Sequence, residues 1–207
     1  MHPVVRAMLQ ANVVKGKAYY DGNGDYITLA DSEDWSFGNG NLEIEFAITQ
    51  ANISTTKMII SQYSTGNYWY LEYQPSNSRF YFLSAVSGSN VANYYFSVTP
   101  QLAVEKTYKL TRVGTSLTLT EDDTPLSATV NTAIGTSNLT NSTSALYIGA
   151  YAYDGSESIN AYMDSFKITK GITVVLDLKF AEEIGATTFI DGTGKTVTTH
   201  GDVVIVE

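Results

Sequence analysis

The stretch LEIEFAIT, residues 42–49, alternates apolar and polar side chains along most of its length. A β-strand sends successive side chains to opposite faces, so that residues two apart share a face. The apolar side carries Leu42, Ile44, Phe46 and Ile48, and the polar side carries Glu43, Glu45 and Thr49. We expect a strand whose apolar side faces a hydrophobic core.

The same period of two recurs on both sides of this stretch, whereas helical spacing is nearly absent. Leu117 and Leu119 alternate with threonines. Near the C-terminus one side of a run carries Val174, Leu176, Leu178 and Phe180. Only residues 5–14 suit a helix, and residues 181–185 suit a turn. Turn signals separate the runs at 21–24, 39–40, 88–90, 114–115, 154–155, 170–171 and 191–194. We therefore predict an all-β fold, a two-sheet antiparallel β-sandwich of the jelly-roll kind.

The composition limits the classes of partner. A chain of 207 residues with 43% hydrophobic content fits a single domain over residues 1–207. The formal charge of -9 disfavours phosphate backbones and anionic lipid surfaces, which bind clustered lysine and arginine. We expect no nucleic-acid partner and no membrane insertion, because no apolar run approaches the ~18 to 20 residues that span a bilayer.

Cysteine is absent, which excludes disulfides, thiolate zinc sites and a cysteine nucleophile. The first residues, MHPVVRAMLQANVV, are interrupted by Arg6 and Gln10, whereas a signal peptide needs a continuous apolar stretch. We expect a protein that is made in the cytoplasm without a signal peptide.

Three segments carry a family pattern through their order and spacing. Residues 17–48 contain YYDGNGDYITL, which is similar to an opening "FDG-x-GDY" turn followed by a strand. Residues 106–126 are similar to a central hairpin with an acidic turn, and residues 145–171 to a closing "L-x-IG" strand, a variable loop and a last strand. Together they resemble laminin-G-like modules of the concanavalin A-like lectin and glucanase superfamily, particularly those of phage virion and tail proteins. The resemblance implies a concanavalin A-like jelly roll.

The C-terminal segment departs from the family order. In phage modules of this kind, segments resembling VVLDLKF and TTFIDGTGKTVTTHGDVVIV precede the opening turn, yet here they occupy residues 174–206. The chain looks circularly permuted, with an N-terminal arm at residues 1–16 and a C-terminal segment at residues 172–207. That segment either completes the sandwich in its own chain, is exchanged with a neighbouring subunit, or continues a repeat whose remainder is absent.

No constellation in the sequence supports catalysis. Glycoside hydrolases on this fold use paired carboxylates, but Glu43 and Glu45 lack the further acids of that pattern and suit an exposed strand face. The sequence suggests no catalytic triad that includes either histidine, His2 or His200. We expect His200 on the surface. Gly194-Lys195-Thr196 lacks the earlier glycine and the following helix of a phosphate loop. We predict no catalytic residues.

Two loops offer oxygen ligands of the kind that calcium prefers. Asp21, Asn23 and Asp25 alternate as in an acidic calcium loop, but no glutamate stands at the twelfth position. A glycine-rich hairpin turn explains these residues better. Asp154 and Glu157 form a weaker second cluster. We predict no metal site and no cofactor, with calcium as the alternative.

Asp164 stands apart from these acids. Alternation in the stretch YMDSFKIT places it on the same face as Phe166 and Ile168, which should be buried. A buried carboxylate without a partner would be costly, so we expect Asp164 to accept hydrogen bonds from a nearby loop. The resemblance also puts an acid here, and we interpret it as structural.

The candidate ligand-binding residues are mostly tyrosines, of which the chain has 15. In GNYWYLEYQ, residues 66–74, the resemblance suggests that Trp69 packs inward and leaves Tyr68 and Tyr70 exposed. Rings of this kind can stack on sugars, while carboxylates and amides fix hydroxyl groups. The predicted ligand-binding residues are Tyr68, Tyr70, Tyr94, Tyr95, Tyr151, Tyr153 and Asp154. The alternative, that the rings only cover sheet surface or a subunit interface, has equal weight.

We therefore expect a non-catalytic recognition module of a phage virion or tail protein that binds a cell-surface glycan or protein. The alternative is a structural virion protein, such as a capsid decoration or cement protein or an assembly adaptor, whose rings meet other subunits, including copies of itself in a homo-oligomer. A glycan-cleaving enzyme is the third hypothesis. The expected location is the virion, after synthesis in the host cytoplasm.

Overall fold

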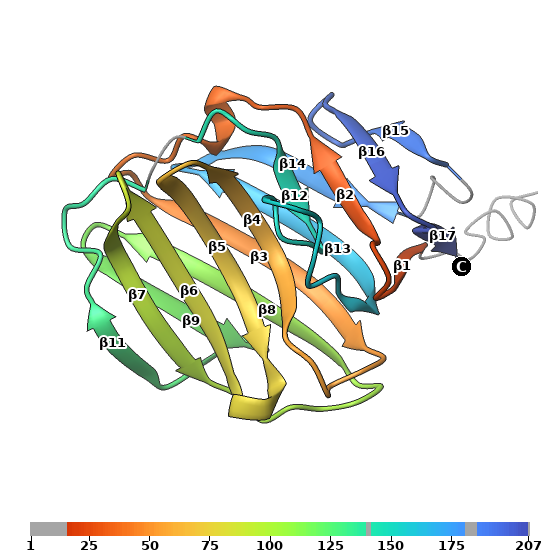
Figure 1. The fold of residues 1–207 in the computed structure, drawn as a ribbon, viewed down its shortest axis with the longest axis horizontal. Helices are drawn as coiled ribbons and strands as arrows, with labels where there is room; N and C mark the ends of the chain where they lie inside the picture. Colours follow the sequence, from red (N-terminus) through yellow and green to blue (C-terminus); the bar gives the residue numbers. More distant parts are fainter. Residues whose placement is uncertain (1–15, 140–141, 181–185, 207) are drawn as a thin grey trace, which may run out of the picture.

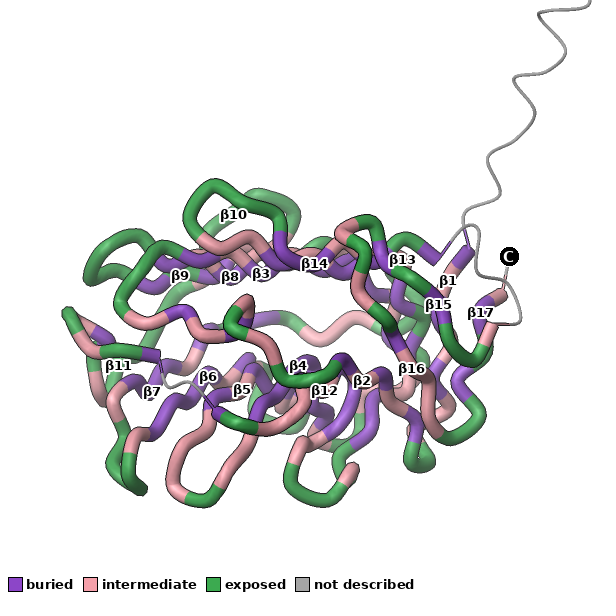
Figure 2. The backbone as a smooth tube through the Cα atoms, turned by 90° about the horizontal axis from the view of Figure 1, so that it is seen from above, coloured by how far each residue is buried: buried purple, intermediate pink, exposed green. Residues whose placement is uncertain are grey.

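The computed structural model describes residues 16–139, 142–180 and 186–206. Its strands form two antiparallel sheets (Figure 1), which lie face to face as two layers with buried residues between them (Figure 2). The predicted two-sheet antiparallel sandwich is confirmed. Within these ranges, no helix has the length and apolar character needed to cross a membrane. The helix suggested for residues 5–14, the turn suggested for 181–185, and His2 lie outside the described residues.

Sheet A has eight strands. In spatial order these are β10 (Thr124–Pro125), β9 (Ser116–Glu121), β8 (Glu105–Val113), β3 (Leu42–Gln50), β13 (Asn160–Lys170), β1 (Lys17–Asp21) and β17 (Val204–Val206), with β14 (Thr173–Lys179) also paired to β13. One half of β13 pairs with β1 and the other half with β14.

Sheet B has nine strands. In spatial order these are β11 (Ala128–Thr132), β7 (Ser89–Ser97), β6 (Arg79–Val86), β5 (Asn67–Gln74), β4 (Lys57–Ser64), β12 (Leu146–Ile148), β2 (Tyr26–Leu29), β16 (Thr196–His200) and β15 (Thr188–Ile190). Two short 3-10 helices, η2 (Glu33–Trp35) and η3 (Pro75–Asn77), lie in the connections.

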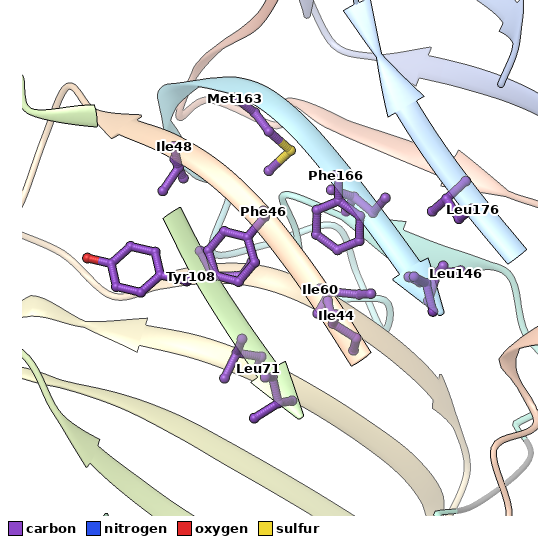
Figure 3. Packing of buried hydrophobic residues seen from close by; sticks show 14 of the residues in the cluster. Ile44, Phe46, Ile48, Ile60, Leu71, Tyr108, Leu146, Met163, Phe166 and Leu176 are labelled. Atoms are coloured by element: carbon purple, nitrogen blue, oxygen red, sulfur yellow. The ribbon is translucent and has the colours of Figure 1, made fainter. Parts of the chain in front are cut away.

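The core lies between the sheets and is built from the inward side of each strand. The apolar side of β3 is buried as predicted, and Figure 3 shows Ile44, Phe46 and Ile48 from this strand beside Phe166 and Tyr108 from its two neighbours. Leu117 and Leu119 are buried as well. Alternation therefore decided the inward side correctly wherever the strands are regular.

A β-bulge in β14 interrupts the alternation that the sequence predicts near the C-terminus. The predicted hairpin is present, but its two turn residues are Gly171 and Ile172, because Lys170 ends β13 and pairs with Thr173. Further along, Ile168 pairs with Leu176 while Thr169 pairs with Val174, so Val175 is an extra residue. The bulge reverses the alternation at this point. Val174 is 43% exposed and Val175 is buried, and the prediction that Val174 faces the core is wrong.

Asp164 is also a bulge residue, because Met163 pairs with Ile48 whereas Ser165 pairs with Ala47. The expected hydrogen bonds from a loop are absent among the described residues. Instead, the ammonium group of Lys17 on β1 lies 2.6 Å from Oδ1 of Asp164. Burial raises the pKa of Asp164, and this ion pair opposes the shift. The carboxylate therefore has a structural partner, but a cation and not a backbone amide.

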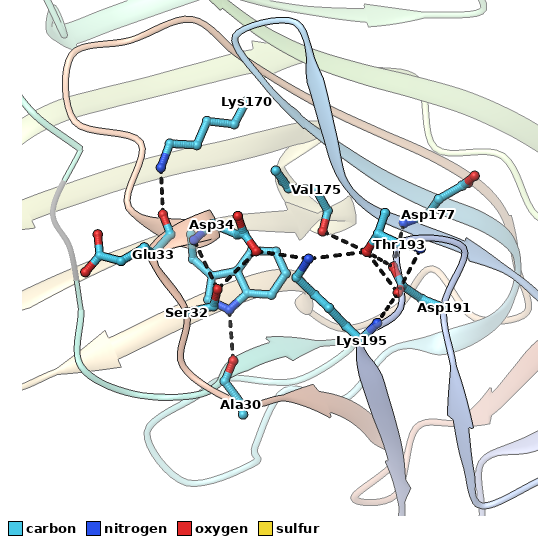
Figure 4. A network of polar contacts seen from close by, with 11 residues as sticks. Ala30, Ser32, Glu33, Asp34, Lys170, Val175, Asp177, Asp191, Thr193 and Lys195 are labelled. Atoms are coloured by element: carbon cyan, nitrogen blue, oxygen red, sulfur yellow. Dashed lines mark hydrogen bonds and ion pairs between the residues drawn. The ribbon is translucent and has the colours of Figure 1, made fainter.

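The C-terminal segment contributes strands to both sheets of its own chain in this structure. A network of hydrogen bonds and ion pairs connects this segment to the rest of the chain (Figure 4). Asp191 accepts hydrogen bonds from the backbone N–H groups of Asp177 (3.0 Å) and Lys195 (2.7 Å). The Lys195 ammonium lies 2.9 Å from a carboxylate oxygen of Asp34, the middle residue of η2. Lys195 is therefore committed to an ion pair at the turn between β15 and β16.

Candidate ligand-binding surface

In β5, which lies between β6 and β4 in sheet B, inward and outward residues alternate regularly. Trp69 is fully buried, and its indole N–H donates to Oε1 of Gln62 at 3.1 Å. Tyr68, Tyr70 and Glu72 lie on the opposite side, away from the core. The inward placement of Trp69 and the outward placement of Tyr68 and Tyr70 agree with the sequence expectation.

Neighbouring strands extend this face into a cluster of rings. Cross-strand pairing puts Tyr63 of β4 opposite Tyr68, and puts Tyr81 of β6 opposite Tyr95 of β7. The loop between β12 and β13 adds two more rings. We call this cluster the tyrosine surface: Tyr63, Tyr68, Tyr70, Tyr81, Tyr95, Tyr151 and Tyr153.

The rings of the tyrosine surface pack against one another in a continuous chain. The centroids of Tyr68 and Tyr70 are 6.2 Å apart at 11°, and those of Tyr81 and Tyr95 are 4.7 Å apart at 16°. Tyr151 meets Tyr70 edge-on at 6.0 Å. Aromatic pairs of these geometries are favourable beyond their buried area. Tyr153 is 66% exposed, whereas the other rings are half-buried.

The loop carrying Tyr151 and Tyr153 is fixed to β4. The Ser61 hydroxyl donates to the carbonyl of Ala150 and accepts from the N–H of Ala152, both at 2.8 Å. Gly149 has a φ of +92°, and a Cβ there would lie 2.8 Å from the buried ring of Tyr20. The start of the loop thus admits only glycine, which holds Tyr151 over sheet B.

Burial affects the phenol groups of this face. It raises the pKa of Tyr81 and of Tyr151 to about 12. It also raises the pKa of Tyr70, with further contributions from Tyr81 and Glu72. These hydroxyls therefore stay protonated at neutral pH and can both donate and accept hydrogen bonds.

One acid lies within the ring cluster. Glu72 is 8% exposed, and Oε1 accepts a hydrogen bond from Nε2 of Gln74 at 2.8 Å. Oε1 of Gln74 in turn accepts from Nε of Arg79 at 2.6 Å, and the Arg79 guanidinium lies 4.0 Å from the centroid of Tyr95. Burial raises the pKa of Glu72, with a further contribution from the charge of Glu157.

The predicted site residues divide between the two sides of the sheet. Tyr68, Tyr70, Tyr95, Tyr151 and Tyr153 come together on the tyrosine surface. Asp154 is exposed in the same loop, where its side chain accepts from the N–H of Ser156 at 2.9 Å.

Tyr94 does not join the tyrosine surface. It is 4% exposed, and its hydroxyl accepts from the N–H of Ile134 within the core. The expectation that Tyr94 belongs to a surface cluster is therefore corrected. The stretch VANYYFS has apolar residues on both faces, so its register could not be chosen from the sequence.

Sequence reasoning missed Tyr63 and Tyr81. The signal was available for Tyr81, because it alternates with Phe80 and Phe82 in the strand RFYFLSAV and both phenylalanines are buried. Tyr63 reaches the cluster only through its cross-strand pairing with Tyr68, which no local pattern reveals.

A second, smaller ring group lies on the same face, over β16, β2 and β12. His200 stacks on Tyr26 at 4.5 Å, and Tyr26 stacks on Tyr147 at 5.1 Å. Nε2 of His200 is 2.8 Å from the Thr28 hydroxyl. His200 is thus half-buried in a ring stack on the outward face of sheet B.

The acidic hairpin between β1 and β2 shows why a turn explains its residues. Asp25 is fully buried, and its two oxygens accept from the N–H groups of Asp21 (2.6 Å) and Asp202 (2.9 Å). Burial raises its pKa to about 6. The carboxylates of these three residues could together offer oxygen atoms to a cation. Each oxygen of Asp25 accepts one backbone N–H and keeps a further lone pair, so these hydrogen bonds hold the hairpin without deciding whether a cation binds there.

Glu43 and Glu45, the acid pair considered for glycoside hydrolysis, lie on β3 of sheet A. Glu45 faces outward on sheet A, 3.0 Å from the ammonium group of Lys109 and 3.2 Å from that of Lys167. Burial alone would raise the pKa of Glu45, but the two lysines outweigh it and hold the pKa below its ordinary value. A general acid for glycoside hydrolysis needs the opposite shift. Glu45 is arranged as an ion-pair partner.

Comparisons with known proteins identify the fold. No family model matches the chain, and no curated protein matches its sequence. Among solved structures, a candidate carbohydrate-binding protein from Bacteroides ovatus is similar over 93% of this chain, with a TM-score of 0.69 and 13% identity. Domains LG4-5 of the mouse laminin alpha1 chain match over 79% of this chain, with a TM-score of 0.60 and 14% identity.

A heptameric pentraxin from Limulus polyphemus, similar to serum amyloid P, matches over 94% of this chain, with a TM-score of 0.61 and 10% identity. The chain spans 60% of the Bacteroides protein and 44% of the laminin fragment, but 96% of the pentraxin. The chain therefore has the laminin-G-like, concanavalin A-like jelly-roll fold that the sequence resemblance implied.

Proposed function

We propose that this chain is a non-catalytic recognition module that binds a glycan on the tyrosine surface. The observation that carries the proposal is the gathering of rings from four strands and one loop on a single outward sheet face. A sheet needs apolar residues on its inward side only, so this second layer of rings is not required by the core. Clustered surface rings mark contact sites.

Tyrosine suits a sugar for two reasons. Its ring contacts the apolar C–H groups of a pyranose or furanose, and its hydroxyl exchanges hydrogen bonds with sugar hydroxyls. Polar side chains stand at the border of the rings, where Asn93 donates to the Tyr81 hydroxyl at 3.3 Å and Asp154 lies beside Tyr153 in the loop. The shared fold with a candidate carbohydrate-binding protein supports the same function.

In this proposal, a catalytic role for the acid pair Glu43 and Glu45 is ruled out by where the pair lies. Glu43 and Glu45 face outward on sheet A, on the opposite side of the sandwich from the tyrosine surface. Glu45 is held ionised by its two lysines. Neither residue can assist a sugar bound on sheet B.

The setting that we propose is a phage virion or tail protein in which this module contacts the surface of a host cell. The support is the sequence resemblance of residues 17–48, 106–126 and 145–171. If the chain instead serves as a decoration protein or adaptor, the tyrosine surface is an interface between subunits. Sedimentation analysis separates the two hypotheses, because a monomer in solution leaves the surface free and an obligate oligomer covers it.

A glycan array tests the proposed function with one matched pair of variants. Tyr153→Ala removes a 66% exposed ring from the tyrosine surface, and Tyr162→Ala removes a 38% exposed ring from the outward face of sheet A. We expect the unchanged chain and Tyr162→Ala to bind the same glycans, and Tyr153→Ala to bind them more weakly. Equal loss in both variants, or no binding by the unchanged chain to any glycan, would overturn the proposal.

A further inference from the structure

The carboxylate of Glu72 lies among the rings of the tyrosine surface and forms no direct ion pair with any described residue. Among the described residues, every ion pair uses a lysine, and none of these pairs includes Glu72, Asp154 or Glu157. All three acids lie on or beside the tyrosine surface. A carboxylate as buried as Glu72 is costly to retain without a charged partner, so its presence calls for an explanation.

The hydrogen bonds of Glu72 leave one oxygen available. Oε1 accepts from Gln74, and in the described part of the chain Oε2 accepts from no donor. The buried side-chain atoms that lack a partner in this part of the chain are Gln50 Oε1, Ser84 Oγ and Asp164 Oδ2. Oε2 of Glu72 is not among these fully buried atoms, and β5 sends this side chain to the ring-covered face.

The surroundings orient this oxygen. Met58 of β4 and Tyr81 of β6 stand opposite Glu72 on the two neighbouring strands. Gln74 holds Oε1 and is itself held by Arg79, whose guanidinium is stacked on Tyr95. Glu72 is therefore a fixed acceptor between apolar walls, and the nearest guanidinium is occupied elsewhere.

The net charge around the rings is negative. Three carboxylates, those of Glu72, Asp154 and Glu157, stand against the Arg79 guanidinium. The remaining cation nearby is Lys57, which is 7% exposed and donates to the carbonyl of Ser158 at 3.1 Å beneath the loop. Lys57 lines the same cavity as Asp154 and Glu157 and offsets part of their charge. Among the described residues named here, three carboxylates thus stand against two cations.

We propose that Glu72 determines the specificity of the tyrosine surface by accepting a hydroxyl of a neutral glycan and by repelling glycans that carry carboxylate or sulfate groups. The inference rests on the proposed function and names the ligand class. A hydroxyl donated to a carboxylate gives a charge-assisted hydrogen bond, which is stronger than a bond between neutral groups. Like charges placed together at an interface disfavour the wrong partner.

The experiment uses an array in matched pairs. It presents neutral cello-, xylo- and arabino-oligosaccharides beside oligogalacturonates and sulfated galactan oligomers. We expect the full-length chain to bind at least one neutral oligosaccharide at least ~10-fold more tightly than any acidic one. In Glu72→Gln, binding of the neutral ligand should fall by about 10-fold, because a charged acceptor becomes a neutral one. Binding of acidic oligosaccharides should rise in the same variant.

Two further variants separate this inference from the proposed function. Glu45→Gln removes a carboxylate from sheet A and should leave the glycan profile unchanged. Tyr153→Ala should weaken binding without changing the preference for neutral glycans. If Tyr153→Ala weakens binding but Glu72→Gln leaves the preference unchanged, the role of Glu72 is wrong and the proposed function stands. Preferential binding of acidic glycans by the unchanged chain overturns the role of Glu72, and binding to no glycan overturns both.

Discussion

The two outward faces of the sandwich cover the same core with different chemistry. On sheet A, charged side chains pair across strands, as Glu45 does with Lys109 and Lys167, and Lys17 with Asp164. On sheet B, rings pack against rings, and among the described residues Glu72 forms no direct ion pair and is linked to Arg79 only through Gln74. The core does not demand this difference, because both sheets bury alternate residues equally well.

The difference indicates which face has a partner. Charges on sheet A satisfy one another and remain compatible with water, so that face needs no ligand. Rings on sheet B expose apolar area, which water solvates poorly and which a ligand can cover. Sheet A has one outward ring pair near its edge, Tyr19 and Tyr162, with centroids 4.8 Å apart. That pair provides a matched control for every test of the tyrosine surface.

The largest expected effect is on binding by a double variant of β5. Tyr68→Ala with Tyr70→Ala should weaken the affinity for the glycan found on the array by roughly 100-fold, as expected when central aromatic contacts are removed. Titration calorimetry measures this. Tyr19→Ala with Tyr162→Ala, the matched pair on sheet A, should bind as the unchanged chain does. Similar losses in both double variants would remove the distinction between the two faces.

The next effect concerns stability within the loop. Tyr151 is half-buried against Tyr63 and Tyr70, whereas Tyr153 is largely exposed. Both rings belong to the same loop, but only Tyr151 is packed on two sides. We now expect Tyr151→Ala to lower the free energy of unfolding by about 1 to 2 kcal/mol and Tyr153→Ala by less than ~0.5 kcal/mol. Urea unfolding measures both, and equal values for the two variants would contradict the packing described here.

The smallest expected effects are on stability and come from Glu45 on sheet A and Glu72 on sheet B. The two residues should change the pH dependence of stability in opposite directions. Glu45 has a lowered pKa, so its contribution to stability is present above the ordinary value of 4.5 and is lost as pH falls. Glu72 has a raised pKa, so its contribution is present at low pH and is lost as pH rises through its folded value.

Unfolding measured from pH 4 to pH 7 tests these signs with Glu45→Gln and Glu72→Gln. The stability of the unchanged chain relative to Glu45→Gln should increase with pH, by no more than ~1 kcal/mol for partly exposed pairs. Relative to Glu72→Gln it should decrease. The same trend in both comparisons would show that the two carboxyl groups have similar surroundings.

Alternation in the sequence was enough to predict the fold and the inward residues of a regular strand such as β3, whereas the inward side of β5 was predicted from the family resemblance. It failed at Asp164 and Val174, because each lies at or beside a bulge, and one inserted residue reverses every side chain beyond it. The tyrosine surface was predicted only in part. Tyr63 and Tyr81 join it through pairing between strands, which depends on the sheet order and not on any local pattern.

The most direct test of the central claim is ¹⁹F NMR of the chain labelled with 3-fluorotyrosine. Each of the 15 tyrosines gives its own resonance, assigned by single Tyr→Phe variants. On addition of the neutral oligosaccharide that binds most tightly, we expect the resonances of Tyr68, Tyr70 and Tyr153 to shift while those of Tyr19 and Tyr162 stay unchanged. Shifts confined to Tyr19 and Tyr162 would contradict the assignment of the binding face to sheet B.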